Sequence, residues 1–355
     1  MVAVRFTHRQ KMAKYDAIIA GASFAGLVVA RTLKGNILLI DGKREIGASQ
    51  KSTCCTYYHI IKKLGCEDSI LQVIDTGILH IGSKNITSRL YYPLATFDYK
   101  KFCQILYEKS NTQFLSTKVR GLKGDKVITD KGNFQSECII DATGWQAILA
   151  SSVRKDFVPK SGKSFGIETT PFYKNKAIEV WLNPQMMPKG VTWIFPCGEF
   201  SRFGIGSYIG KTRLKEGLET FLKEFELKMT KDLHGGHFTN NFREPTVENI
   251  FVVGDAAGQC LPFSGEGIRS SLYFGQKCGK IIQRIIDGKI TRNEGLKEYR
   301  QVVLRHKKYY TFLSWAQKIS ITFPNSWLSY FVKFISLRPI FKYAEKKYVD
   351  LANLK

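Results

Sequence analysis

Acidic residues are scarce in this sequence, and the motifs of several common protein classes are missing from it. Asp and Glu number 30 against 54 for Lys and Arg, which gives 355 residues a formal net charge of +24. Such an excess favours an anionic partner. Nucleic acid is disfavoured, because no zinc-finger spacing, RNP-type aromatic motif or isolated basic tail occurs and the Lys and Arg residues are spread along the chain. An anionic membrane surface, a phosphorylated substrate and a merely solvated lysine-rich surface are the alternatives that remain.

Paired cysteines and a secretory signal are also lacking. The eight cysteines include no CxxC pair, and most stand singly in apolar runs such as ECIIDATG. We therefore expect reduced thiols in a cytoplasmic protein, and no metal site. The leader MVAVRFTHRQK is basic without an apolar core, and Met12 offers a second start. Low-complexity tracts and repeats are absent, so a globular protein with more than one domain is expected.

The segment from Tyr15 reads YDAIIAGASFAGLVVARTLKGNILLIDGKREIG, which predicts a strand, a glycine-containing turn, a helix and a second strand. Gly21, Ser23 and Gly26 occupy the positions of a GxGxxG turn, where small residues let the backbone approach a pyrophosphate at the helix amino terminus. Asp41 ends the second strand, 20 residues after Gly21, where a carboxylate can bind ribose hydroxyls. This unit predicts a dinucleotide site, and glycines that serve packing alone are the alternative.

A second candidate site reads ENIFVVGDAAGQCLPFSGEGIRSSLYFGQKCGKII near residue 250. The pattern predicts a strand, a loop, and a helix that opens at residues 265–268. A carboxylate at the strand tip can bind the ribityl hydroxyls of a flavin, and the positive end of the helix can face the isoalloxazine ring. The candidate flavin contacts are Asp255, Pro262, Gly265, Gly267 and Ile268.

GDAAG with the residues that follow it resembles the second FAD motif of the flavoprotein superfamily that includes p-hydroxybenzoate hydroxylase and geranylgeranyl reductase. VITDKGNFQSECIIDATGWQAILA resembles the middle motif of that superfamily, which adds Gly144 beside the nucleotide. The resemblance implies FAD as cofactor and an α/β fold. That fold has a Rossmann-like FAD-binding domain of the glutathione-reductase type, an inserted antiparallel substrate sheet and a helical carboxyl-terminal segment.

The order of the motifs predicts how the domains divide the chain. Residues 15–74, 96–155 and 245–290 would form one discontinuous FAD-binding domain. Residues 75–95 and 156–244 would form the substrate-binding sheet, since GILHIGSKNITSRLYY, KAIEVWLN and RFGIGSYIG are rich in β-branched and aromatic residues. Residues 291–355 have helical spacing.

The run VTWIFP resembles a signature of the geranylgeranyl reductases, YxWxFP followed by GxG. The matching positions are Val191, Trp193, Phe195, Pro196, Gly204 and Gly206, and all but Val191 keep the family residue. Trp193 and Phe195 share one strand face and can line an apolar cavity for an isoprenoid tail, while glycines leave the neighbouring strand open for the chain. Rings that only fill the core of the sheet are the alternative. Flavin halogenases carry WxWxIP, and Phe195 favours the reductase.

The family also has a cysteine near the flavin, in the loop after the second strand. That loop reads GASQKSTCCTYY, so Cys54 or Cys55 is the candidate for a thiol that donates a proton or orients the alkene. The spacing does not choose between them, and a thiol that is only buried is the alternative. Leu94 stands where the superfamily has an arginine that contacts FAD, so that contact is either absent or supplied elsewhere, with Arg44 as the candidate. Glu266 replaces a glycine at the flavin edge.

Residues 319–343, ISITFPNSWLSYFVKFISLRPIFKY, are aromatic and too interrupted to predict a transmembrane helix. An amphipathic helix in the membrane interface and a helix packed on the FAD-binding domain are equally consistent with this pattern. The first alternative would place the protein peripherally on the inner face of the membrane.

Taken together, the motifs indicate an FAD-dependent reductase that saturates C=C bonds of geranylgeranyl or other isoprenoid chains in a membrane lipid, diphosphate or quinone. A flavin-dependent monooxygenase or halogenase is one alternative, and a non-catalytic prenyl-lipid-binding protein is another. No second GxGxxG unit follows a strand, so the electron donor would be transiently bound NAD(P)H or a ferredoxin.

Overall fold

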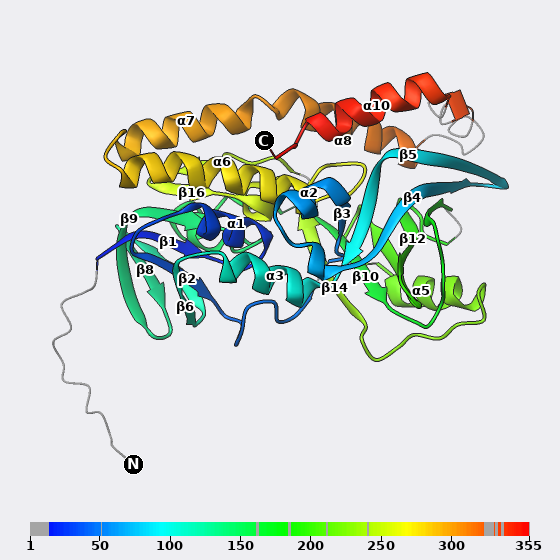
Figure 1. Cartoon of the computed structure of the whole chain (residues 1–355), viewed down its shortest axis with the longest axis horizontal. Helices are drawn as coiled ribbons and strands as arrows, with labels where there is room; N and C mark the ends of the chain where they lie inside the picture. Colours follow the sequence, from blue (N-terminus) through cyan, green and yellow to red (C-terminus); the bar gives the residue numbers. More distant parts are fainter. Residues whose placement is uncertain are drawn as a thin grey trace, which may run out of the picture.

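The computed structural model describes residues 14–50, 52–160, 163–183, 186–210, 212–239, 241–322, 330, 333–334 and 337–354. The basic leader and Met12 lie outside the described residues, as does part of the aromatic segment 319–343. Two eight-stranded sheets form the body of the protein, and helices cover them (Figure 1).

The first sheet is mostly parallel. In spatial order its strands are β15 (Thr246–Val247), β16 (Ile250–Val252), β9 (Gly132–Asp141), β1 (Lys14–Ala20), β2 (Ile37–Asp41) and β6 (Thr112–Ser116), with β7 (Val119–Lys123) and β8 (Lys126–Thr129) attached to β9. Alternate residues of β1 enter two hydrophobic clusters: Ile19 packs on one face and Ile18 on the other. Burial on both faces explains why β1 and β2 are apolar runs rather than alternating strands.

Helices cover both faces of this sheet. One face carries α1 (Phe24–Thr32), α3 (Tyr99–Glu108) and α6 (Ile268–Ile286), and the other carries α4 (Ile148–Val153). Helices α1 and α6 approach closely, because a Cβ added at Gly275 would lie 2.4 Å from Val28 Cγ1. This contact brings the two motifs that open α1 and α6 to the same end of the sheet.

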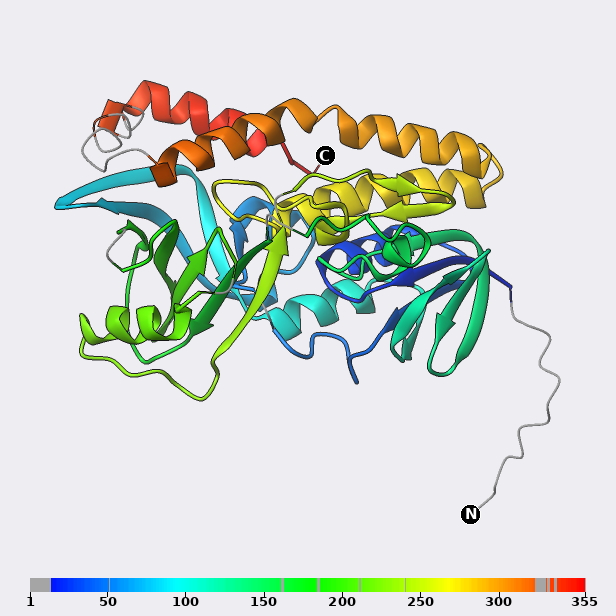
Figure 2. The same cartoon turned by 180° about the vertical axis from the view of Figure 1, so that it is seen from behind.

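The second sheet is mostly antiparallel and extends away from the first (Figures 1 and 2). In spatial order its strands are β14 (His234–Thr239), β10 (Lys163–Thr169), β13 (Phe200–Ser207), β12 (Gly190–Cys197), β11 (Ile178–Leu182), β4 (Ile70–Ile81), β5 (Lys84–Phe97) and β3 (Cys55–Tyr57). On one face Ile194, Phe203 and Ile205 pack beneath α5 (Leu214–Lys223). We call the opposite face, which bears Trp193, the site face.

The sheet takes more of the chain than the sequence predicts. The expected boundary between residues 74 and 75 falls inside β4, which is one strand from residue 70 to residue 81. Strand β5 likewise continues to residue 97, beyond the expected boundary at 95. The predicted boundaries separate the segments that carry the nucleotide motifs from the β-rich segments, whereas β4 and β5 continue across them because their backbones stay hydrogen-bonded to one another.

The carboxyl-terminal segment is helical, as predicted. Helices α7 (Arg292–Leu304), α8 (Lys307–Thr322) and α10 (Arg338–Asp350) run along one side of the molecule, from α6 to the β4–β5 hairpin (Figures 1 and 2). Short helices α2 (Tyr58–Lys63), η1 (Glu67–Ser69) and η2 (Gly254–Ala257) complete the fold. No helix among the described residues is long and apolar enough to span a membrane.

Candidate functional site

The three predicted nucleotide motifs meet at the amino end of α1. A Cβ added at Gly21, whose φ is +107°, would lie 2.1 Å from the carbonyl oxygen of Ala142 in the middle motif. A Cβ added at Gly26 would lie 1.9 Å from the carbonyl oxygen of Gly21. One at Gly254 would lie 2.8 Å from Ala25 Cβ. Glycine is therefore required for the motifs to approach one another this closely.

The first turn of α1 keeps its amino end available to an anion. Ser23 is the N-cap residue, but its side chain makes no capping hydrogen bond; Ser23 Oγ instead lies 3.1 Å from Tyr99 Oη. Lys43 Nζ donates a hydrogen bond to the same Tyr99 oxygen at 2.9 Å. A lysine ammonium thus stands beside the positive end of the helix, and both favour a negatively charged group there.

Asp41 is fixed at the tip of β2. One carboxylate oxygen accepts a hydrogen bond from the backbone N–H of Ala22 at 2.7 Å, and the other accepts from that of Lys43 at 2.9 Å. Each oxygen keeps a second lone pair, which can accept a hydrogen bond from a ribose hydroxyl. Arg44 is exposed in the same loop, and its contact with FAD stays a prediction.

A buried carboxylate, that of Asp141, organises the backbone of the middle motif. Asp141 accepts hydrogen bonds from Thr143 Oγ1 at 2.6 Å and from the Ala150 backbone at 2.9 Å. Burial raises its pKa, and these hydrogen bonds oppose the rise. Gly144 follows at a φ of +80° with no other atom within 4 Å of an added Cβ, so this glycine borders open space.

In the second motif Asp255 lies against the amino end of α6. A Cβ added at Gly267, the N-cap residue, would lie 3.5 Å from Asp255 Oδ1. Burial raises the pKa of Asp255 to about 6, and the nearby Arg243 opposes the rise. Pro262 is buried, Gly265 adopts a φ of +66°, and Ile268 is the first residue of α6. The predicted flavin contacts of this motif therefore surround one helix terminus.

Glu266, the departure from the glycine pattern, has a structural partner. Its carboxylate accepts two hydrogen bonds from the guanidinium of Arg269, at 2.7 and 2.8 Å, and a third from Tyr348 Oη at 2.8 Å. The Arg269 side chain is fully buried, and it also donates to the backbone oxygens of Tyr348 and Val349. Glu266 thus ties the predicted flavin edge to α10.

On the site face Trp193 lies flat across the neighbouring strand. A Cβ added at Gly204 would lie 2.1 Å from Trp193 Cε2, and one at Gly206 would lie 3.1 Å from its Cζ3. The expectation that Gly204 and Gly206 leave this strand open for a substrate chain is therefore wrong, because the indole fills that space. Trp193 Nε1 reaches one strand further and donates to Glu168 Oε2 at 3.0 Å.

Glu168 is a buried carboxylate with charged neighbours. It is 3% exposed, His234 Nε2 lies 3.2 Å from its Oε1, and Arg202 Nε lies 4.0 Å away. His234 Nδ1 lies 2.9 Å from the Asp232 carbonyl oxygen, so each ring nitrogen has an acceptor nearby, and Nε2 also lies 3.4 Å from Gln50 Nε2. Burial lowers the pKa of His234, but the hydrogen bonds with Glu168 and the Asp232 backbone, together with the negative charges of both acids, outweigh it, so the net shift is upward.

Arg202 holds the loop that carries the candidate thiols. Its guanidinium donates to the backbone oxygens of Thr53, of Cys54 (3.2 Å) and of Phe97 (3.1 Å). Cys54 adopts a φ of +51°, a backbone conformation that favours glycine. Three hydrogen bonds from one buried cation therefore stabilise an otherwise unfavourable turn just before β3.

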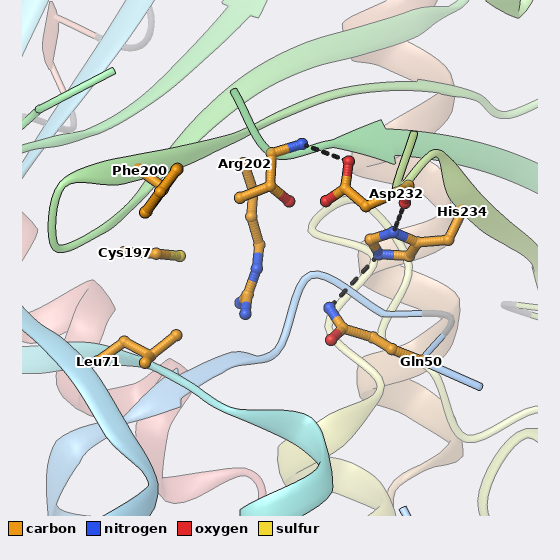
Figure 3. Close-up of a pocket in the computed structure, with 8 residues that line it drawn as sticks. Gln50, Leu71, Cys197, Phe200, Arg202, Asp232 and His234 are labelled. Carbon is orange, nitrogen blue, oxygen red and sulfur yellow. Dashed lines mark hydrogen bonds between the residues drawn. The ribbon is translucent and has the colours of Figure 1, made fainter. Parts of the chain in front are cut away.

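A cavity of about 440 Å³ opens beside this charged group (Figure 3). Its lining residues are Gln50, Leu71, Thr170, Cys197, Phe200, Arg202, Asp232 and His234. Leu71 and Phe200 are largely exposed at its rim, while Arg202 and His234 point into it (Figure 3). The cavity therefore extends from the apolar rim formed by Leu71 and Phe200 to Arg202 and His234, the two basic residues beside Glu168.

Known proteins resemble this chain along most of its length, although no protein-family model matches it. A digeranylgeranylglycerophospholipid reductase from Methanocaldococcus jannaschii is 24% identical over 329 residues, covering 83% of this chain and 84% of that protein. One from Methanococcus aeolicus is 28% identical over 334 residues, 84% of each. A solved geranylgeranyl bacteriochlorophyll reductase-like structure from Thermoplasma acidophilum gives a TM-score of 0.83 at 17% identity, covering 96% of this chain and 98% of its own.

The chain is similar to geranylgeranyl reductases over most of its length. It is thus an FAD-dependent oxidoreductase, as its motifs predict. The superposition on the Thermoplasma structure confirms the predicted fold class. The FAD-dependent chondrochloren halogenase of a myxobacterium also shares the fold, with a TM-score of 0.65 at 13% identity over 84% of this chain and 82% of its own.

FAD fits the residues that the structure brings together. The amino end of α1 and Lys43 suit a pyrophosphate, Asp41 suits a ribose, and Asp255 at the start of α6 suits the ribityl chain. Gly144 of the middle motif borders open space. Leu94 belongs to β5, where it pairs with Tyr57 and Ile74. The arginine that the superfamily has at this position is therefore missing, and this position offers the cofactor no charged contact.

The two candidate thiols lie in different surroundings. Cys54 is completely buried in the core beneath α1, and its thiol donates to the Ser52 backbone oxygen at 3.1 Å. Cys55 begins β3 and is partly exposed. Burial raises the pKa of the Cys55 thiol, and Arg202 opposes the rise. Cys55 is therefore the better placed of the two, although the catalytic role of either stays a prediction.

Four residues of this site carry no sequence motif: Lys43, Glu168, Arg202 and His234. Lys43 directly follows the strand that ends in Asp41, which is a usable signal for a phosphate contact. The other three lie on β10, β13 and β14, within strands that are otherwise glycine-rich or apolar. A charged residue at a buried strand position is the only local sign of them.

Proposed function

We propose that this protein reduces C=C bonds in the isoprenoid chains of a membrane lipid, with a digeranylgeranyl glycerophospholipid as the leading substrate class. The relatives named above support this substrate class. The observation that carries the proposal is the site face, which changes from charged to apolar along one row of the sheet. The Cys55 thiol lies on the edge strand β3, close enough to Arg202 for that charge to oppose the rise in its pKa.

That row crosses seven strands. Register pairs join His234 to Glu168, Glu168 to Gly204 and Gly204 to Trp193 at the charged end. Beyond Trp193 the row continues through half-buried Val180, Leu79 and Ile86. The four apolar positions span three strand spacings, roughly 14 Å in all. We call these four positions the apolar row. An isoprenoid tail would lie along it, from Trp193 toward Ile86.

Phe195 and Val191 widen the apolar wall. Both lie on β12, two residues on either side of Trp193, so all three side chains share the site face. Phe195 and Val191 are half-buried, whereas Pro196 is buried, and its carbonyl oxygen accepts a hydrogen bond from Thr96 Oγ1 at 2.6 Å. Val191 removes the hydroxyl that the family signature carries here, so the wall is apolar throughout.

FAD held by the motifs described above would supply, in its reduced form, a hydride for one alkene carbon. The other alkene carbon needs a proton, and we assign its delivery to Cys55 Sγ. Because burial raises the pKa of this thiol, the sulfur keeps its proton until the substrate accepts it. Arg202 then stabilises the thiolate, and solvent returns a proton to it before the next turnover.

The deciding assay is an anaerobic single turnover. Protein reduced with dithionite is mixed with a digeranylgeranyl phospholipid, and mass spectrometry follows saturation of the chains. We expect product to form as the flavin absorbance returns. Reoxidation by oxygen alone, without a saturated product, would refute the proposal. Protein purified without flavin absorbance would instead indicate a lipid-binding protein.

Electrons for repeated turnovers come from NAD(P)H or a ferredoxin. The two donors are separated by measuring anaerobic flavin reduction with each in turn. NAD(P)H oxidation that consumes oxygen and is stimulated by an aromatic compound would instead indicate a monooxygenase. A lipid substrate also implies that the protein works at the membrane surface, on the cytoplasmic side.

A further inference from the structure

Large aromatic side chains are exposed along the carboxyl-terminal helices, outside the site described above. On α8 the exposed fractions are 45% for Tyr309, 59% for Phe312 and 60% for Trp315. Tyr330, Phe334, Leu337 and Tyr343 are between 52% and 67% exposed. Contiguous exposed apolar side chains of this size on a folded protein usually mark an interaction surface.

These aromatics are additional to the face by which α8 packs on the protein. Tyr310 and Leu313 are buried, and Tyr310 Oη donates to the Gln259 backbone oxygen at 2.7 Å. Phe312 and Trp315 lie on the opposite side of the helix, with ring centroids 6.3 Å apart. Helix α8 therefore has one apolar face buried in the protein and a second one facing solvent.

The same segment is strongly basic. Residues 305–350 contain nine Lys and Arg against two acids, Glu345 and Asp350. Glu345 is buried, where it accepts hydrogen bonds from the Tyr91 and Tyr92 backbones. The exposed lysines on the two helices are Lys307, Lys308, Lys318, Lys342, Lys346 and Lys347. Aromatic rings bordered by lysines are complementary to an anionic phospholipid surface.

We propose that the outward faces of α8 and α10, together with the exposed residues 330, 334 and 337, form a docking face for an anionic phospholipid bilayer. Both helices lie on the same side of the molecule (Figure 2). Rings at this face would sit at headgroup level, and the lysines would contact lipid phosphates. Docking here goes beyond the proposed reaction and does not depend on it.

The docking face connects directly to the predicted site. Helix α10 is joined to β5 through Glu345 and to the flavin edge through Tyr348, whose hydroxyl contacts Glu266. Lys342 also lies 5.4 Å from the ring centroid of Tyr91 on β5. A bilayer held by this face would therefore lie next to the strands that carry the apolar row.

Flotation with vesicles that contain no isoprenoid tests docking separately from catalysis. We expect the full chain to bind vesicles of phosphatidylglycerol and phosphatidylcholine at least tenfold more tightly than vesicles of phosphatidylcholine alone. High salt should weaken this binding, because it screens exposed charges. Lys346→Gln with Lys347→Gln should weaken it about 30-fold, from the usual contribution of two basic residues near an anionic surface.

Phe312→Ser with Trp315→Ser should weaken binding at least tenfold, since two apolar side chains lose their place in the interface. Matched controls come from surfaces outside the docking face: Lys215→Gln with Lys223→Gln on α5, and Ile209→Ser, whose side chain is 58% exposed. The controls should bind as the parent does. Equal binding by all variants, or no binding to any vesicle, overturns the proposal. Sedimentation that shows a dimer lost in the aromatic variant, without vesicle binding, assigns the face to a second copy instead.

Discussion

Replacing Gly204 by alanine should displace the Trp193 indole and thereby damage both stability and the site. The new Cβ would lie 2.1 Å from Trp193 Cε2 and 2.2 Å from Cζ2, far inside contact distance. Overpacking of this kind costs about 1–3 kcal/mol. Moving the ring also weakens the hydrogen bond to buried Glu168, for about 1 kcal/mol more. We therefore expect Gly204→Ala to lower the free energy of unfolding by about 2–4 kcal/mol.

Urea unfolding of the flavin-loaded protein, followed by circular dichroism, measures this loss. Gly77→Ala is the matched control, because Gly77 lies in β4 of the same sheet and its added Cβ would be 3.8 Å from the nearest atom, Leu90 Cδ2. The control should change stability by less than about 0.5 kcal/mol, apart from the modest effect of the backbone. Single-turnover lipid reduction should fall in Gly204→Ala and persist in Gly77→Ala.

A second background isolates the cause. In Trp193→Leu the clashing ring is gone, so adding Gly204→Ala there should cost less than half of what it costs in the parent. An equal cost in both backgrounds would show that the glycine serves the backbone rather than the indole. A negligible cost in the parent would refute the packing that we describe.

Three further predictions concern the thiol, the buried histidine and the apolar row. Cys55→Ser should abolish saturation of the lipid while the flavin is still reduced, whereas Cys54→Ser should lower the unfolding midpoint and leave turnover in place; the reverse pattern would assign the acid to Cys54. Because the folded protein raises the pKa of His234, its pairing with Glu168 stabilises the fold below about pH 6.5 and is lost as pH rises through the folded-state pKa. His234→Gln should flatten that decline in urea titrations between pH 5 and 8. Val180→Trp should raise KM for long isoprenoid chains more than for short ones, and an equal rise would place the tail elsewhere.

The cofactor site was largely predictable because its requirements are local. Gly26 is needed for a contact with Gly21 inside the same turn, whereas Gly21 makes room for Ala142 after the adjacent strand β9; both glycines stand in one short motif, so their spacing is visible in the sequence. Asp41 and Asp255 follow strands that are readable as apolar runs. What the motifs omit is Lys43, whose place beside Tyr99 depends on the packing of α3 against α1.

The charged group on the site face was not predictable in the same way. Glu168, Arg202 and His234 come from three strands, and they meet only because β10 lies between β13 and β14. The same long-range pairing explains why the prediction for Gly204 was wrong: this glycine makes room for the Trp193 ring from β12 rather than for a ligand. Strand alternation likewise predicts that adjacent Cys54 and Cys55 point apart, but the turn before β3 decides which of them is buried.

Glu266 shows why a departure from a family pattern need not signal a lost function. A carboxylate at the flavin edge would repel electron density on a reduced ring if it were free. Here Arg269 neutralises it through two hydrogen bonds, and Tyr348 donates a third, so the pair presents little net charge to the cofactor. The same contacts hold α10 in place. Glycine at position 266 would leave the backbone of the predicted flavin edge more flexible. Glu266 instead links that edge to α10, one of the basic, aromatic helices that we propose dock on the membrane.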